Sequence, residues 1–332
     1  LPSPRLGAWA LGPLVALLLG GLAGRAGADG SDRLRLQRLS RSGSADVAAY
    51  LTHVRGDGAL VSGHAASDFK LTVDGVDLGP GTRALPFSET KEPIYLVAVV
   101  QLSSPAEPML EELRRGLRAL ADAALALPGS HVDLIGYAGE VKRLCEGCSP
   151  AQLRGAIDRL AIDPEGAEGR LLEAVQVGID LLRSQPAGAR KLVALVSDGI
   201  DLNNERRGFT EVGRRAEQAG VVIDTVGYAP FDPGKLRSLT ELTGRSDGVE
   251  RVAKQPAEVA PRLAALASEI GGQQVVTFTP PIAIEGGAHE YQVLTESGAA
   301  SQPLSSALVA PPQQQGDERA PMPRWPLAFL GL

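Results

Sequence analysis

The stretch Ile94–Pro105, IYLVAVVQLSSP, constrains the fold more than any other part of this chain. It opens with a continuous apolar run, which indicates a strand buried on both faces of a sheet. The run ends in small polar residues and a proline, and apolar residues then recur at helical spacing over 106–127. A buried strand, a short turn and a long amphipathic helix form the first half of a βαβ unit. Ligands usually bind at the carboxyl end of such a central strand, so we expect function at 101–105.

Residues 91–271 continue this alternation of strand and helix patterns, which predicts an α/β domain with a doubly wound, mostly parallel sheet and helices on both faces. The expected strands are Tyr95–Gln101, His131–Tyr137, Val141–Leu144, Lys191–Ser197, Val221–Gly227 and Gly248–Val252. The expected helices cover 106–127, 150–161, 170–184, 209–219, 235–243 and 257–270.

Two β-rich segments flank this domain in the sequence. Over 45–90, Phe69, Leu71 and Val73 alternate with polar neighbours ahead of the turn signal Asp74-Gly75, which predicts a hairpin. Residues 272–300 return to strand character, and we expect them to pair with 45–90. The Arg- and Ser-rich residues 29–44 are predicted to be a linker without function.

Composition limits the partners of this chain. It has 332 residues, enough to bury a sizeable core, and a net charge of −6. Lysine and arginine are scattered among acidic residues, so the basic surface that nucleic-acid binding requires is missing from the sequence pattern. We therefore do not expect a nucleic-acid partner.

The N-terminal residues 1–28 have the pattern of a secretory signal peptide. A positive charge at Arg5 precedes an apolar run and the small-residue site Ala26-Gly27-Ala28. We expect cleavage after Ala28 and export to the periplasm or the cell surface; the alternative is an uncleaved anchor helix.

The C-terminal residues carry a second localisation signal. A Pro/Gln-rich linker is predicted over 301–323, followed by the apolar tail 324–332. The tail is too short to span a bilayer, which takes about 20 residues. Arg324 and Trp325 nevertheless suit a membrane interface. The tail is therefore either a weak docking segment or the start of a membrane anchor that would tether the protein.

Three segments at the carboxyl ends of expected strands or before a helix carry a family resemblance: Gln101–Pro105, 169–172, and Ser197-Asp198-Gly199. Together they resemble the von Willebrand factor A domain, over about 91–271. In that family the first strand ends in D-x-S-x-S, a later loop supplies a threonine and a further strand ends in Asp-Gly. These residues build a metal-ion-dependent adhesion site, whose divalent cation is completed by a carboxylate of a partner protein. Residues 45–90 resemble the β-segment that precedes this domain in many exported bacterial members.

The chain departs from the family's metal-binding pattern. Gln101 replaces the first aspartate, Pro105 the second serine and Arg170 the threonine, whereas Ser103 and Asp198 are kept. Magnesium and calcium prefer carboxylates and other oxygen ligands, so we expect no metal ligands and no divalent cation or other cofactor. The Arg170 guanidinium can pair with Asp198 instead. Without a metal, Asp198 is expected to cap local backbone amides, and Ser103 to cap the first helix.

Cys145 and Cys148 form a single C-x-x-C pair ahead of Pro150. Zinc would need further ligands, and the four histidines are scattered. In an exported protein we predict a disulfide that clamps the turn before the helix at 150. A reactive thiol pair is the alternative.

These observations lead to two functional hypotheses. The first is an exported, non-enzymatic module that binds another protein through the strand-end face of its α/β domain. The second is an exported thiol-disulfide or hydrolytic enzyme, using the cysteine pair or an unrecognised pair of acids. The sequence contains no H-E-x-x-H and no phosphate-binding loop after the first strand, so the first hypothesis is favoured.

Overall fold

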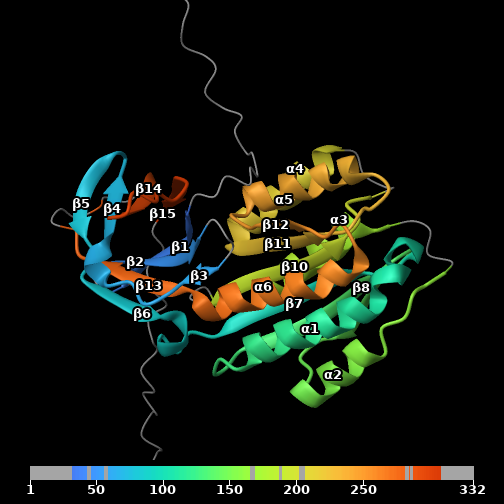
Figure 1. The fold of residues 1–332 in the computed structure, drawn as a ribbon. Helices are drawn as coiled ribbons and strands as arrows, with labels where there is room; N and C mark the ends of the chain where they lie inside the picture. The colour runs from blue at the N-terminus through green and yellow to red at the C-terminus, as the bar shows by residue number, and fades with distance from the viewer. Residues whose placement is uncertain are drawn as a thin grey trace, which may run out of the picture.

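The computed structural model describes residues 32–42, 46–55, 59–164, 169–186, 189–201, 206–280, 284 and 287–307 (Figure 1). The predicted signal peptide, the apolar tail and most of the predicted linker over 301–323 lie outside these residues. Within them, no helix is both long enough and apolar enough to cross a bilayer.

A six-stranded sheet forms the centre of the larger part of the molecule. Its strands, in spatial order, are β12 (Glu250–Val252), β11 (Val221–Gly227), β10 (Arg190–Ser197), β7 (Ile94–Gln101), β8 (His131–Tyr137) and β9 (Val141–Cys145). All neighbours are parallel except β9, which runs antiparallel to β8. Read from β9, this is the 3-2-1-4-5-6 order of doubly wound sheets, so the predicted fold class is confirmed. The strand order reverses between β7 and β10.

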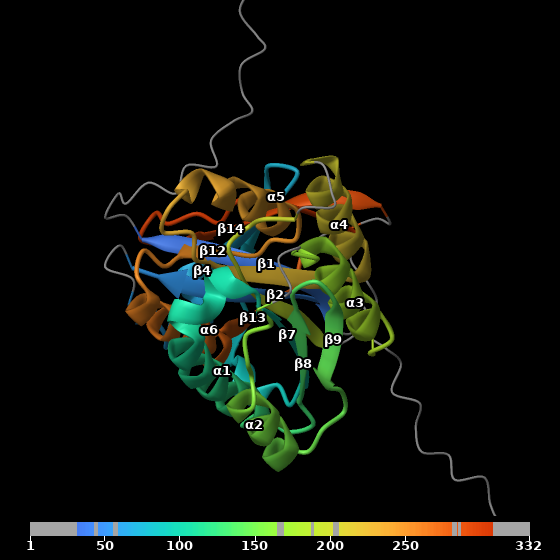
Figure 2. The same ribbon diagram turned by 90° about the vertical axis from the view of Figure 1, so that its right-hand side faces the viewer.

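Helices cover both faces of this sheet. One face holds α1 (Leu110–Leu125), α2 (Pro150–Asp158) and α6 (Val259–Gly272), and the other holds α3 (Leu171–Arg183), α4 (Arg206–Ala219) and α5 (Arg237–Arg245). Figure 2 shows α1, α2 and α6 on one side of the sheet and α3 and α4 on the other. Successive residues of β7 serve the two cores: Leu96 and Ala98 face α1 and α6, and Val97 and Val99 face α3. Burial on both faces is what the continuous apolar run predicts.

Short 3₁₀ segments introduce several elements. They are η1 (Ala66–Asp68), η2 (Phe87–Glu89), η3 (Ser104–Met109), η4 (Pro233–Leu236) and η5 (Pro256–Glu258). The helix expected from residue 106 starts within η3 and becomes α-helical only at Leu110. Pro108 lacks the N–H that an α-helical hydrogen bond would need, which suits a 3₁₀ entry.

The flanking β-strands form two further sheets with a shared core. One contains β1 (Arg33–Ser42), β2 (Asp46–Val54), β13 (Gln274–Phe278) and β6 (Arg83–Pro86), with β3 (Leu60–Val61) beside β2. The other contains β15 (Leu304–Ala307), β14 (Ala288–Thr295), β4 (Phe69–Val73) and β5 (Val76–Pro80). β13 pairs with β2 and β6, and β14 with β4, so strands from before and after the α/β domain lie side by side (Figure 1).

Two predicted linkers are wrong where the structure describes them. Residues 33–42 form β1, and its irregular pattern explains why it was missed. Leu34 and Leu36 alternate as in a strand, but the register shifts between Leu36 and Arg38, so Leu39 returns to the buried face out of phase. In the segment 301–323, Leu304–Ala307 forms the edge strand β15 against β14.

A cluster of buried and partly buried charged side chains joins β1 to the α/β domain. Glu269 on α6 binds Arg35 of β1 (Nη1–Oε2 2.7 Å) and Arg251 of β12 (Nη2–Oε1 2.6 Å). Asp224, 1% exposed on β11, lies 3.9 Å from Arg35 and 3.7 Å from Arg251 and accepts a hydrogen bond of 2.6 Å from the Val249 N–H. The strand that sequence analysis missed therefore supplies one of the two cations in this cluster.

Removing Asp224 should strongly destabilise the fold. Asp224→Ala leaves two arginines with too little counter-charge in a buried site, which typically costs about 3–5 kcal/mol. Asp122→Ala is the matched control, because it removes an exposed ion pair with Arg154 (2.8 Å) and should change little. Urea unfolding of both variants measures the difference; equal losses would contradict a structural role for the buried cluster.

Candidate functional site

The candidate site lies where the strand order reverses. β7, β10, β11 and β8 are parallel, so their carboxyl ends meet at one edge of the sheet, which we call the carboxyl edge. Gln101 ends β7 and Ser197 ends β10. This is the place at which open α/β sheets bind ligands.

Gln101 joins the two strand ends through its side-chain amide. It is 3% exposed, its Nε2 donates to Ser103 Oγ (2.8 Å), and its Oε1 accepts from the Asp198 N–H (2.7 Å). The structure thus brings together three of the predicted site residues: Gln101, Ser103 and Asp198. Both halves of the amide are used within the chain, and a carboxylate could not donate to Ser103 in the same way.

A second buried hydrogen bond joins the ends of β8 and β10. The Tyr137 hydroxyl at the end of β8 donates to Ser197 Oγ (2.7 Å), which accepts from the Gly199 N–H (2.9 Å). Burial raises the pKa of Tyr137 well above its usual value, so the phenol stays a neutral donor. Tyr137 was not among the predicted site residues, and Ser197 was named only as part of the Ser197-Asp198-Gly199 segment. Their signal was positional, because Tyr137 pairs in register with Gln101 and Ser197 precedes Asp198.

Asp198 closes its own turn. Its Oδ1 accepts from the Ile200 N–H (3.0 Å), the local capping role expected for it. Gly199 follows with φ +79°, and an added Cβ would lie 2.6 Å from the Lys235 carbonyl oxygen. Ser238 Oγ donates to the Gly199 carbonyl oxygen (2.6 Å), so the loop after β11 packs tightly on this turn.

The other two predicted site residues behave differently from expectation. Arg170 is the N-cap residue of α3 and pairs with Glu173 on that helix (Nη1–Oε2 3.1 Å), so the expected pair with Asp198 is wrong. Pro105 is exposed in the first turn of η3 and has no polar side-chain atom to offer. Ser103 occupies the N-cap of η3 without a capping bond, which corrects the second expectation. Its hydroxyl accepts from Gln101 instead.

The side-chain oxygens of these residues do not fit the ligand set of a divalent cation. The Gln101 carbonyl oxygen and one Asp198 oxygen already accept backbone N–H groups, and the Arg170 guanidinium adds a positive charge at this edge. In the part of the chain that the structure describes, no group of three or more His, Cys, Asp or Glu side chains is placed to hold a metal. Magnesium and calcium need several free oxygens around one point.

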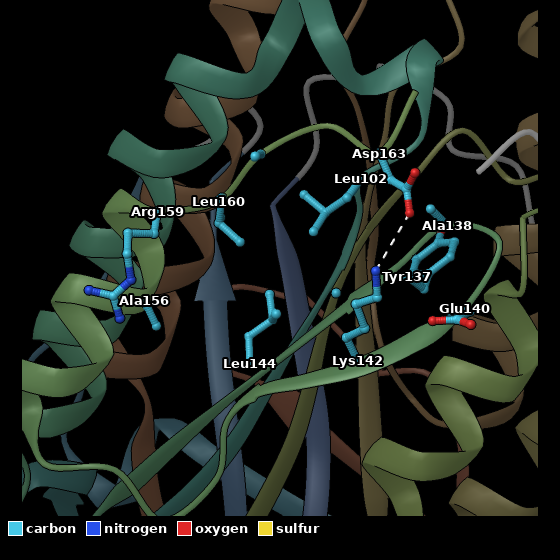
Figure 3. A pocket seen from close by; sticks show the side chains of 12 residues that line it. Leu102, Tyr137, Ala138, Glu140, Lys142, Leu144, Ala156, Arg159, Leu160 and Asp163 are labelled. Carbon is cyan, nitrogen blue, oxygen red and sulfur yellow. Dashed lines mark ion pairs between the residues drawn. The ribbon is translucent and has the colours of Figure 1, made fainter. Parts of the chain in front are cut away.

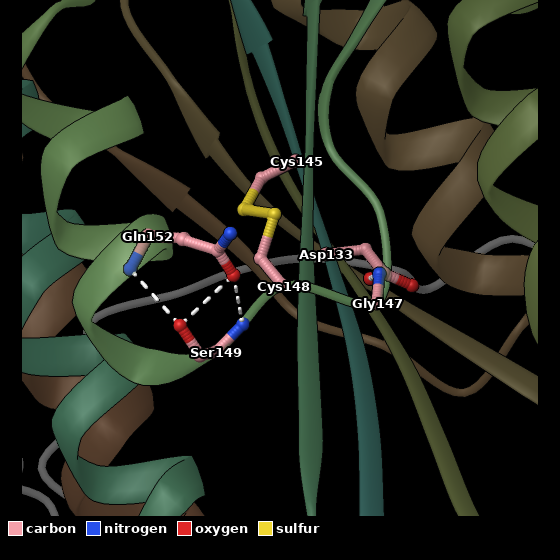
Figure 4. Close-up of a disulfide and its surroundings, with 6 residues drawn as sticks. All are labelled: Asp133, Cys145, Gly147, Cys148, Ser149 and Gln152. Atoms are coloured by element: carbon pink, nitrogen blue, oxygen red, sulfur yellow. Dashed lines mark hydrogen bonds between the residues drawn. A yellow bond between two sulfur atoms is a disulfide. The ribbon is translucent and has the colours of Figure 1, made fainter.

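The predicted disulfide is confirmed (Figure 4). Cys145 ends β9 and is bonded to Cys148, with Cα atoms 5.7 Å apart. Ser149 then caps α2, because its Oγ accepts from the Gln152 N–H (3.4 Å) while Gln152 Oε1 accepts from the Ser149 N–H (2.9 Å). The bond therefore fixes the turn that leads from β9 into α2. Both cysteines of the chain are used in it.

Loss of this disulfide should cost little stability. The cysteines are three positions apart, and closing so short a loop contributes about 2 kcal/mol by loop entropy. We expect Cys145→Ala/Cys148→Ala to lower the free energy of unfolding by about that amount without changing the fold. Mass spectrometry before and after reduction checks the bond itself, and a native protein that gains no mass on reduction would contradict it.

A cleft opens beside the site, between β8, β9 and the end of α2 (Figure 3). Its volume is about 340 Å³, and its apolar lining consists of Leu102, Leu144, Ala156 and Leu160. Gly136 makes this lining possible, since a Cβ there would lie 2.6 Å from Leu102 Cδ1 and 2.9 Å from Leu144 Cδ1. Its charged rim is formed by Glu140, Lys142, Arg159 and Asp163. No motif marks the cleft, because its residues come from three separate stretches of the sequence.

The three segments that resemble the von Willebrand factor A domain thus meet at one edge of a doubly wound sheet. The α/β part of this chain has the doubly wound fold that this resemblance implies, and in the sequence it lies between the strands of a smaller β part. The sequence matches no family model, and no curated protein is significantly similar to it.

Among solved structures, the chain is similar to a von Willebrand factor type A protein from Catenulispora acidiphila, with 10% identity over 85% of this chain and 74% of that one (TM-score 0.47). It is also similar to a mutant of the PilB minor pilin from Streptococcus sanguinis, with 13% identity over 73% of this chain and 79% of that one (TM-score 0.47). A third is the von Willebrand factor domain of the type V pili tip protein Mfa5 from Porphyromonas gingivalis, with 13% identity over 54% of this chain and 95% of that one (TM-score 0.44).

Proposed function

We propose that this chain is an exported, non-enzymatic module that binds another protein through its carboxyl edge without a divalent cation. The observation that carries this proposal is the side chain of Gln101. Its amide links Ser103 to Asp198 where the family's first metal-binding aspartate would stand. The edge therefore holds itself together without a cation.

The charge at this edge suggests how a partner is recognised. In the family that the sequence resembles, a metal ion receives a carboxylate of the partner. Here the Arg170 guanidinium is partly exposed at the same edge, with Glu173 as its ion-pair partner. A guanidinium can bind a carboxylate directly, through two parallel hydrogen bonds. An acidic side chain of the partner would then compete with Glu173 for Arg170.

Export is supported by two features. Residues 1–28 have the pattern of a signal peptide, and the disulfide is of a kind that persists in oxidising compartments. The periplasm or the cell surface is therefore the proposed location. A tether through 324–332 remains part of the sequence-based hypothesis.

The enzymatic alternative has little support. Both cysteines are engaged in the disulfide, and the carboxylates of Asp198 and Asp201 accept from the N–H groups of Ile200 and Leu172 (3.0 and 2.7 Å). Among the described residues, no free thiol is present that could serve as a nucleophile.

Metal titration tests the first half of the proposal. Calorimetry with Mg²⁺, Ca²⁺ and Mn²⁺ should give no saturable heat, because few free oxygens point to one place. Asp198→Ala should lower stability by about 1 kcal/mol through the lost turn hydrogen bond and leave partner binding largely intact. A saturable heat of micromolar affinity that Asp198→Ala abolishes would overturn metal independence.

Charge reversal at the two ends of α3 tests the second half. Arg170→Glu changes the carboxyl edge, whereas Arg183→Glu makes the same change at the opposite end of the same helix. Envelope proteins captured by the immobilised wild-type chain, in EDTA, should be lost with Arg170→Glu and retained with Arg183→Glu. If both variants capture the same protein equally well, the carboxyl edge is not the binding face.

A further inference from the structure

One aromatic side chain stands free of the molecule near the candidate site. Phe231 is 99% exposed in the loop that follows β11, at the carboxyl edge. Pro230 and Pro233 flank the Phe231-Asp232 pair and restrict its backbone. Large apolar side chains are normally covered, and a phenylalanine is worth about 1.5–3 kcal/mol when buried.

The loop that presents Phe231 is held in place. Asp232 Oδ1 accepts from the Gly234 N–H (3.2 Å), and Ser238 Oγ at the start of α5 donates to the Gly199 carbonyl oxygen (2.6 Å). A side chain on an anchored loop loses little conformational freedom on binding, which is typical of an interface anchor.

The cleft beside α2 offers a matching receptor at the same edge. A dry cavity of about 150 Å³ can hold a benzene ring, so 340 Å³ lined by Leu102, Leu144 and Leu160 has room for a phenyl group. β11 and β8 are separated by β10 and β7, so the ends of these two strands lie about 14 Å apart at strand spacing. The segment after Phe231 packs through Leu236 on the face of the sheet opposite to Leu102 and Leu160. Because β10 and β7 stand between them, Phe231 suits the cleft of another molecule rather than its own.

The charges around the two features are complementary. Exposed Asp232 and Lys235 flank Phe231, and exposed Arg159 and Glu140 stand on the rim of the cleft. Within the described residues, neither Arg159 nor Glu140 has an ion-pair partner, whereas Lys142 is paired with Asp163 (3.6 Å; Figure 3). An incoming Phe231 loop could therefore place an acid near Arg159 and an amine near Glu140.

We propose that a second copy of this chain occupies the cleft. Two copies meet at their carboxyl edges about a twofold axis, and each inserts its Phe231 into the cleft of the other. A twofold contact requires both complementary features on one surface, and this edge carries both. The inference rests on the proposed function, since it takes the carboxyl edge to be the binding face and adds a second copy of this chain as a partner there.

Sedimentation equilibrium of the purified chain, up to about 1 mM, tests the dimer. The wild-type chain should reach the mass of two copies. Phe231→Ala removes both anchors, and Ala161→Trp fills the mouth of the cleft from an exposed position. Each should raise the dissociation constant about 100-fold or more. Val76→Ala, which removes a 59% exposed side chain of the β part, should leave it unchanged.

Mixing the two interface variants gives a sharper test. Phe231→Ala keeps its cleft and Ala161→Trp keeps its phenylalanine, so the mixture retains one of the two contacts and should associate better than either alone. A monomeric wild type, a dimer indifferent to Phe231→Ala, or a mass growing beyond two copies overturns the proposal. If the wild type is monomeric but still captures an envelope protein through Arg170, the dimer proposal is overturned and the proposed function stands. If the wild type is monomeric and Phe231→Ala loses that protein, the cleft or the anchor serves a different partner.

Discussion

Burial of β7 on both faces is the constraint on which the rest of this structure depends. A strand in that position cannot leave polar atoms unsatisfied at its end, because water does not reach them. Gln101 meets this requirement within the protein. Its amide N–H donates to Ser103, and its amide oxygen accepts from the Asp198 N–H. A carboxylate in the same place would be a buried negative charge in need of a cation. The glutamine therefore accounts for a strand end that is closed by hydrogen bonds within the chain.

The attachment of the β part to the α/β domain follows a different principle. Arg35, Arg251, Asp224 and Glu269 form a network of buried charges from β1, β12, β11 and α6. Arg190 at the start of β10 adds a hydrogen bond to Gln37 of β1 (3.3 Å), and burial lowers the pKa of Arg190 to about 10. Ion pairs of this kind are weak evidence for stability in themselves, but breaking one is costly. Here they join β1 to β11, β12 and α6.

The sequence could predict the elements that have strong periodicity. The apolar run of β7 and the alternation after it define the doubly wound sheet, and the cysteine spacing defines the disulfide. It could not predict β1, since a register shift between Leu36 and Arg38 breaks the period, nor β15, which is short and polar.

At the site, the sequence identified Gln101, Ser103 and Asp198 through a family pattern but assigned two hydrogen bonds wrongly. Arg170 had a closer partner one helical turn away in Glu173, and Ser103 had one in the Gln101 amide. Tyr137, the cleft and the exposure of Phe231 depend on how distant segments meet, which no local pattern records.

The insertion of the α/β domain into the β part also affects how the last strands of the β part find their partners during folding. The hydrogen bond from Glu290 to Asp74 joins residues 216 positions apart, and a contact that distant is normally slow to form. Pro86 and Gln274, however, are direct register partners at the entrance and exit of the α/β domain. Once the α/β domain has folded, it no longer acts as a long flexible loop. It holds Pro86 and Gln274 next to each other. β13 and β14 then start close to their partner strands. They cover the open edges of β2 and β4 as soon as the C-terminal strands of the β part are available.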